Sequence, residues 1–228
     1  LSPHLATNAY RLPYQHDGMN ADDLRTAVET AKQTELGRLG SSKLLLALTD
    51  AELDRESVLQ TAAASEIAAR ETFSTWAADE PHDAAADLFA DIADQEQRHY
   101  ERVTDLLGEE VEPPGRGPMH AYLRERDGTA ARLAGGLLGR TLVSDRTHLQ
   151  VVNFFINEAD ETTADVFRDL RTETREAQEQ GLALLDSVCA TDEDWETAET
   201  VANYVIQLAY DDYTDVLVGM GVDPKQIC

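Results

Sequence analysis

Two stretches of the chain carry an apolar stripe of helical period that polar residues interrupt. Between residues 88 and 106, one side of a 3.6-residue helix carries Leu88, Ile92, Glu96, His99, Val103 and Leu106. Between residues 59 and 76, a second stripe consists of Leu59, Ala62, Glu66, Ala69, Phe73 and Trp76. Glu66, Glu96 and His99 therefore occupy helix faces that should be buried.

The same period continues through most of the chain, and no segment shows the alternation or the β-branched density of a sheet. We therefore predict an all-α protein. Thr49, with Glu52 three residues later, has the pattern of a capping box and predicts the start of a long helix. The predicted helices cover residues 21–36, 41–48, 49–78, 82–107, 119–126, 129–160, 164–188 and 194–219.

The organisation of the chain indicates one helical domain over residues 19–228. Residues 1–18 lack a helical period and are predicted to form a poorly ordered extension. The Pro/Gly-rich stretch GEEVEPPGRGP separates two helical hairpins. ADEPHDAAADLFADI in the first hairpin has an echo, ADETTADVFRDL, in the second, which predicts a duplication with Phe89 over Phe167. Two such hairpins make a four-helix bundle.

The net charge of the chain limits the classes of partner that it can bind. Its 228 residues carry a net charge of -25, with 19 basic residues against 44 acidic ones, and only three of the basic residues are lysines. This balance resembles that of proteins from salt-loving archaea. It argues against nucleic acid and against an anionic membrane as partners, because no basic stripe exists to neutralise phosphates.

The cysteines and the lengths of the apolar runs indicate the cellular location of the protein. Cys189 and Cys228 are the only cysteines and form no CxxC pair, so neither a disulfide scaffold nor a thiolate metal site is predicted. No secretion signal and no run of about 20 apolar residues is present, which excludes a membrane span. A reducing cytosol is the simplest location.

The polar residues in the two stripes are candidates for metal ligands. A buried carboxylate without a partner is costly, and one bound cation would satisfy Glu66, Glu96 and His99 together. Carboxylate oxygen with imidazole nitrogen suits iron, manganese or zinc, and the spacing Glu-x-x-His directs both groups inward from one helix. A hydrogen-bonded polar cluster without metal is the alternative, and both interpretations stay open.

The quoted stripes also carry a resemblance. SEIAARETFSTWA, followed by LFADIADQEQRHYERV, resembles the first hairpin of the rubrerythrin branch of the ferritin-like superfamily. The resemblance implies a ferritin-like four-helix bundle with extra terminal helices. It also implies a non-haem iron or manganese site, with Glu66, Glu96 and His99 as ligands, and a reaction with peroxide or oxygen as an oxidoreductase or peroxidase.

The second half departs from this family's pattern. Aligning the two hairpins with Phe89 over Phe167 places Thr174 and Ala177 where a second Glu-x-x-His pair is expected. Glu173 falls one position off the stripe, which in a helix is a rotation of about 100°. Asp145 and His148 are then the candidates to complete a partial site. The chain also lacks the four-cysteine rubredoxin domain of full-length rubrerythrins, so an external electron donor would be required.

A non-catalytic bundle with a vestigial site, acting in protein association, is the second functional hypothesis. Three tyrosines of the last predicted helix would then contribute to the core or to an interface, including that of a homo-oligomer: Tyr204, Tyr210 and Tyr213. Three glycines lie in a helical context and are predicted to permit close helix packing: Gly135, Gly136 and Gly139.

Overall fold

The computed structural model describes residues 19–112 and 117–225, and within these ranges the protein is all-α, as predicted, with no strand. The predicted extension 1–18 and Cys228 lie outside the described residues. The helices are α1 (Ala21–Ala31), α2 (Gln33–Leu39), α3 (Lys43–Leu48), α4 (Arg55–Asp79), α5 (Asp83–Leu107), α6 (Pro118–Arg124), α7 (Thr129–Leu133), the π-helical η1 (Ala134–Gly139), α8 (Arg140–Asn157), α9 (Glu161–Val188) and α10 (Asp192–Gly219).

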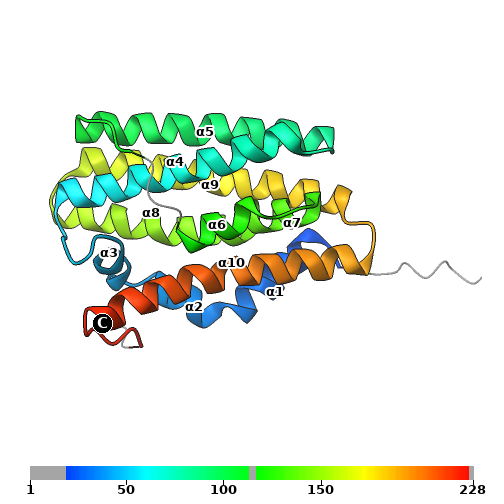
Figure 1. Ribbon diagram of the computed structural model, residues 1–228. Coiled ribbons are helices and arrows are strands. Elements are labelled where there is room, and N and C mark those ends of the chain that lie inside the picture. Colours follow the sequence, from blue (N-terminus) through cyan, green and yellow to red (C-terminus); the bar gives the residue numbers. More distant parts are fainter. Residues whose placement is uncertain (1–18, 113–116, 226–228) are drawn as a thin grey trace, which may run out of the picture.

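Four long helices form the centre of the molecule (Figure 1). α4 packs along α5, α8 packs along α9, and α5 contacts α9 across the bundle. α10 packs against η1 and α8 on the side that faces away from α5. It also contacts α1 and α2. No helix in the described ranges has both the length and the apolar character needed to cross a bilayer.

Two separate apolar clusters fill the interior of the bundle. One includes Phe73, Trp76 and Phe89, and the other includes Phe155 and Phe167. Both apolar stripes predicted from the sequence contribute to these clusters. The polar stripe residues fall between the clusters along α4 and α5, so the fold places them in the middle of the bundle, away from solvent.

The two hairpins are tied together at both ends. Arg55, at the start of α4, pairs with Asp160 in the turn between α8 and α9. At the opposite end, Arg132 of α7 pairs with Glu80 in the turn between α4 and α5, with Nη1 3.0 Å from Oε2. Each of these ion pairs therefore joins one hairpin, or the segment that leads into it, to the turn of the other. The superposition of Phe89 on Phe167 stays a prediction.

Two predicted boundaries are wrong. The segment predicted as one helix over 21–36 is divided into α1 and α2 at Lys32. Thr49 ends α3 instead of opening α4, because its hydroxyl donates to the Leu45 carbonyl at 2.8 Å. Asp54 caps α4 in its place, since its carboxylate accepts from the Ser57 amide at 2.8 Å.

The predicted helix over 129–160 is continuous to Asn157 but passes through the π-helical segment η1. Gly139 lies against α10, and a Cβ atom there would come 2.8 Å from the Ala202 carbonyl oxygen. The predicted role of the glycines in close packing is confirmed at this position. A π-helical turn changes which side chains of the following helix face the bundle, and Arg140 is the first residue after it.

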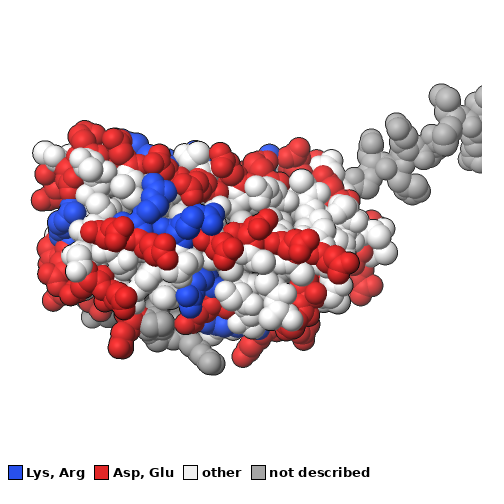
Figure 2. Space-filling model, turned by 90° about the horizontal axis from the view of Figure 1, so that it is seen from above, with Lys and Arg blue, Asp and Glu red and all other residues white. Residues whose placement is uncertain are grey.

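The surface charge leads to a prediction about salt. Asp and Glu cover much of the face shown in Figure 2, with Lys and Arg gathered in a few places between them. We expect the unfolding temperature, followed by circular dichroism, to rise as KCl increases from tenths molar to molar levels. The Debye length falls to about 3 Å at 1 M salt, which screens the repulsion among the acidic groups. An unfolding temperature that does not respond to KCl would contradict this prediction.

Candidate metal centre

The structure brings Glu66, Glu96 and His99 together in the interior of the bundle. α4 supplies Glu66, and α5 supplies Glu96 and His99 one turn apart. One ligand atom from each lies within 4.8 Å of the other two. The exposed fractions are 3% for Glu66, 1% for Glu96 and 0% for His99. Two carboxylates and an imidazole therefore share a small volume that bulk water does not reach.

The spacing of these atoms suits coordination of one ion. His99 Nδ1 lies 3.7 Å from Glu66 Oε2 and 3.7 Å from Glu96 Oε2. Two ligands bound to one ion at ~2.1 Å in tetrahedral geometry are about 3.4 Å apart. His99 Nδ1 and Glu96 Oε2 are fully buried and have no hydrogen-bond partner among the described residues. Such atoms are uncommon in folded proteins and require an explanation.

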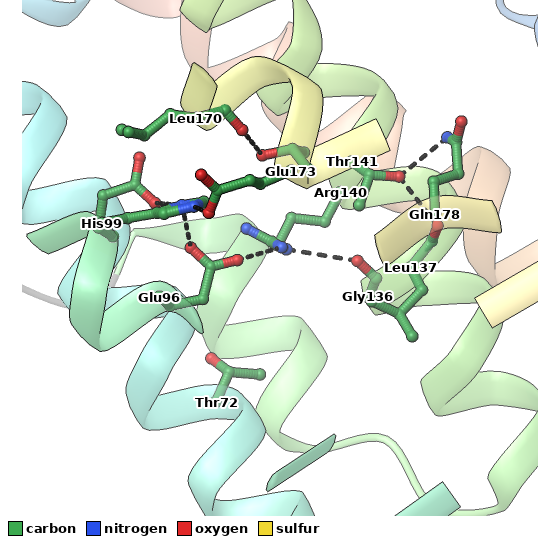
Figure 3. Close-up of polar contacts among 12 residues, drawn as sticks. Thr72, Glu96, His99, Gly136, Leu137, Arg140, Thr141, Leu170, Glu173 and Gln178 are labelled. Atoms are coloured by element: carbon green, nitrogen blue, oxygen red, sulfur yellow. Dashed lines mark hydrogen bonds and ion pairs between the residues drawn. The ribbon is translucent and has the colours of Figure 1, made fainter. Parts of the chain in front are cut away.

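The opposite nitrogen of His99 is held by Glu173 of α9 (Figure 3). His99 Nε2 lies 2.9 Å from Glu173 Oε2. Arg102 Nη1 donates to Glu173 Oε1 at 2.9 Å. Burial raises the pKa of Glu173, but His99 and Arg102 outweigh burial and lower it. An ionised carboxylate only accepts, so Nε2 carries the proton and Nδ1 faces Glu66 and Glu96. Metal-binding histidines commonly have such a carboxylate partner.

Glu173 lies one position off the stripe in the sequence, yet its long side chain reaches His99. Thr174 and Ala177, the residues on the stripe, are buried and offer no ligand to the cluster. The Thr174 hydroxyl donates to the Leu170 carbonyl at 2.9 Å. The second hairpin therefore contributes a carboxylate that supports His99 and no second pair of ligands.

Arg140 of α8 is a member of the cluster that the sequence analysis did not identify. Its Nη2 donates to Glu96 Oε1 at 2.7 Å, and its Nε donates to the Gly136 carbonyl at 3.3 Å (Figure 3). The residue is 2% exposed, and its guanidinium lies over the Phe73 ring, 5.0 Å from the ring centre. Arg140 thus places a fixed positive charge on the far oxygen of Glu96.

His148 and Asp145, the other candidates on α8, lie in different surroundings. His148 reaches the cluster, with Nε2 3.0 Å from Glu66 Oε1. Asp145 is buried, but Arg171 and Arg175 of α9 donate to its Oδ1 at 2.8 and 2.6 Å. Burial raises the pKa of Asp145, and these two arginines lower it by a larger amount. The structure therefore places Asp145 in an arginine cluster between α8 and α9.

The charges at the centre leave room for one more cation. Glu66, Glu96 and Glu173 are three carboxylates, and Arg140 and Arg102 supply two guanidinium groups. The third positive charge can come from a proton on His99 or His148, or from a metal ion bound to His99 Nδ1. Burial lowers the pKa of His99, but contacts with Glu66 and Glu96 outweigh it and raise the pKa to about 10. Proton and metal are alternatives for the same nitrogen atom.

The carboxylate of Glu66 remains available as a ligand. Burial raises its pKa, but the hydrogen bond with His148 and the contact with His99 outweigh burial, so the pKa lies well below its usual range. The two oxygens of Glu66 face different histidines: Oε1 faces His148, and Oε2 faces His99. Glu66 is therefore an ionised group at physiological pH, as metal binding requires.

The chain matches no protein-family model, no curated protein and no solved structure. The chemistry of the centre is therefore inferred from the geometry of its residues.

Proposed function

We propose that the protein binds one transition-metal ion, iron or manganese, through Glu66, Glu96 and His99 in a ferritin-like four-helix bundle. The observation that carries this proposal is the pair of buried atoms without partners, Glu96 Oε2 and His99 Nδ1, that face Glu66 Oε2. An unsatisfied buried polar atom costs about 1–3 kcal/mol, and an ion bound among the three atoms would remove this cost.

The same residues favour one ion per chain. A di-iron centre of the rubrerythrin type requires a second Glu-x-x-His pair, and Thr174 and Ala177 stand in its place. Arg140 already neutralises the outer oxygen of Glu96, at 2.7 Å. A second ion beside this guanidinium would meet like charge in a site of low dielectric, which is strongly unfavourable.

The reaction that fits this centre is reduction of a small oxidant, peroxide or oxygen, by a non-haem oxidoreductase. A bound iron or manganese ion would supply the redox chemistry. Burial of all three ligands restricts access to molecules of this size. Glu173 fixes the ring of His99, and Arg140 fixes Glu96, so both ligands are held in place before an ion binds. Electrons would come from an external donor.

A second function, a non-catalytic bundle with a vestigial site that acts in protein association, also has an observation in its favour. A protonated His99 would balance the charge of the cluster without metal, and His148 already pairs with Glu66 at 3.0 Å. In that case the polar cluster would contribute to stability and to the register of the helices.

Metal titration of chelator-treated protein distinguishes the two functions. We expect calorimetry with Mn²⁺, under molar KCl, to show one ion per chain for the wild type. Replacing both Glu96 and His99 with glutamine should abolish detectable binding, because two of the three ligands are lost. Glu173→Gln should weaken binding by roughly 10–100-fold, since the carboxylate that orients His99 is lost.

Asp145→Asn is the matched control, because it removes a buried carboxylate of the same bundle that faces arginines instead of the cluster. Its metal affinity should equal that of the wild type. Equally negligible binding by the wild type and by the double variant would favour the non-catalytic function. Two ions per chain would contradict the role given to Arg140.

A further inference from the structure

A cavity of about 250 Å³ lies apart from the cluster of Glu66, Glu96 and His99, where α2, α3, α4, α6, α8 and α10 meet. Its walls are mainly aliphatic and include Leu39, Leu44, Ala68, Met119, Val143 and Val216. An apolar cavity of about 150 Å³ holds benzene, so this volume suits a molecule of roughly ten non-hydrogen atoms. The cavity has the size of a small-molecule site and no part in the proposed metal centre.

His120 of α6 lines the cavity, is 8% exposed and carries the imidazole of the lining. The lining also includes hydroxyl groups, from Thr61, Ser65, Ser144, Thr147 and the buried Tyr213. Its Nδ1 lies 3.1 Å from the hydroxyl of Thr72. That hydroxyl has a single proton, which it donates to the Ala68 carbonyl at 2.9 Å. Thr72 must therefore accept from His120, so Nδ1 carries the proton of the imidazole.

The other nitrogen, His120 Nε2, is then a lone-pair acceptor. It has no hydrogen-bond partner among the described residues. It is also absent from the fully buried atoms without a partner in this part of the chain, so it is accessible from outside. Burial, together with the positive charges of Arg140 and Arg124, lowers the pKa of His120 to about 3. The ring is therefore neutral at physiological pH and presents an acceptor to a ligand in the cavity.

The charges around the cavity select against an anion. Asp212, an exposed residue of α10, is the one charged residue among the described residues of the lining, which include no lysine or arginine. The protein as a whole carries a net charge of -25. A ligand with a carboxylate or phosphate would find no counter-charge among the described lining residues, and they would not compensate its desolvation.

We propose that this cavity binds an uncharged, mainly apolar molecule of roughly ten non-hydrogen atoms that bears a hydroxyl group. The aliphatic walls bury the hydrocarbon part, and the hydroxyl donates to His120 Nε2. Alcohols and phenols are the chemical classes that meet these requirements. The site does not depend on metal at Glu66, Glu96 and His99, so it stands whether or not that ion binds.

Three probes of similar size test the proposal by calorimetry at molar KCl: 1-octanol, heptyl methyl ether and octanoate. The ether is an isomer of octanol that lacks a hydrogen-bond donor, and octanoate carries a negative charge. We expect one octanol per chain, bound about fivefold more tightly than the ether, the effect of one hydrogen bond worth about 1 kcal/mol. Octanoate should bind more weakly than either.

Two variants assign the binding to this cavity. His120→Phe keeps a ring of similar shape and removes the acceptor, so octanol and the ether should bind equally. Ala68→Leu adds side-chain volume to the cavity wall and should abolish binding of octanol. Ala90→Leu, at an exposed position of α5, is its control and should bind octanol like the wild type.

The comparison of probes on the wild type needs no variant to fold. Failure of octanol to bind up to its solubility limit would overturn the proposal. Ether or octanoate binding as tightly as octanol would also overturn it, because the hydroxyl and the neutral charge would then have no role. The metal-site double variant should bind octanol unchanged, which separates this result from that of the metal titration.

Discussion

Replacing Arg140 with methionine should lower the free energy of unfolding of the metal-free protein by about 3–5 kcal/mol. The guanidinium is 2% exposed and donates to Glu96 at 2.7 Å, so the substitution leaves a buried carboxylate without its counter-charge. Methionine keeps much of the volume of the arginine side chain, which limits the contribution of a cavity. Denaturant unfolding at constant KCl measures the change.

Arg98→Met is the matched control, because Arg98 is exposed on α5. Its effect should be within about 0.5 kcal/mol of zero. Replacing Glu96 by glutamine together with Arg140→Met should recover part of the loss, since the buried charge is then removed as well. An Arg140 variant as stable as the Arg98 variant would show that the pair contributes nothing to the fold.

The Arg140 variant also tests whether the arginine and a metal ion share Glu96. An ion bound at Glu96 would replace part of the missing positive charge. We therefore expect Mn²⁺ to raise the unfolding temperature of Arg140→Met more than that of the wild type. Equal increases would indicate that Arg140 and the ion do not share Glu96.

Gly139→Ala should lower the free energy of unfolding by about 1–3 kcal/mol. A Cβ atom at this position would lie 2.8 Å from the Ala202 carbonyl oxygen and 3.0 Å from Val205 Cβ. The carbonyl belongs to the backbone of α10, so the whole helix must move to relieve the contact. The displacement would reach Arg140, the next residue, and through it Glu96.

Gly37→Ala provides a control of opposite sign. Gly37 is exposed within α2, and a Cβ atom there would meet nothing within 4 Å. Alanine favours a helix over glycine by about 0.8–1.0 kcal/mol, so this variant should be slightly more stable than the wild type. Denaturant unfolding of both variants tests the pair, and a stabilised Gly139 variant would exclude close packing of η1 on α10.

The pattern of residues along the chain is enough to predict the helices and the faces that they bury. Helical period is a local property, so Glu66, Glu96 and His99 could be placed on buried faces before any partner was known. The turn at Pro81 and the end of α5 at Gly108 are also local, because the residue before a proline disfavours the helical conformation and Gly108 caps α5 in the left-handed conformation, with φ of 86°. Thr49 was misjudged because two capping patterns, at Thr49 and Asp54, compete within a few residues.

The groups that lie opposite each buried side chain depend on how the helices pack, which no local pattern predicts. Period predicts the face of a residue, but it does not predict which groups a long, flexible side chain will reach. Glu173 reaches His99 from one position off the stripe, and Arg140 enters the core after a π-helical turn that no local pattern indicated. Asp145, a candidate ligand by its sequence, is buried, yet Arg171 and Arg175 of α9 donate to it. A metal centre and its supporting charges depend on distances between four helices, which are fixed only when the helices pack.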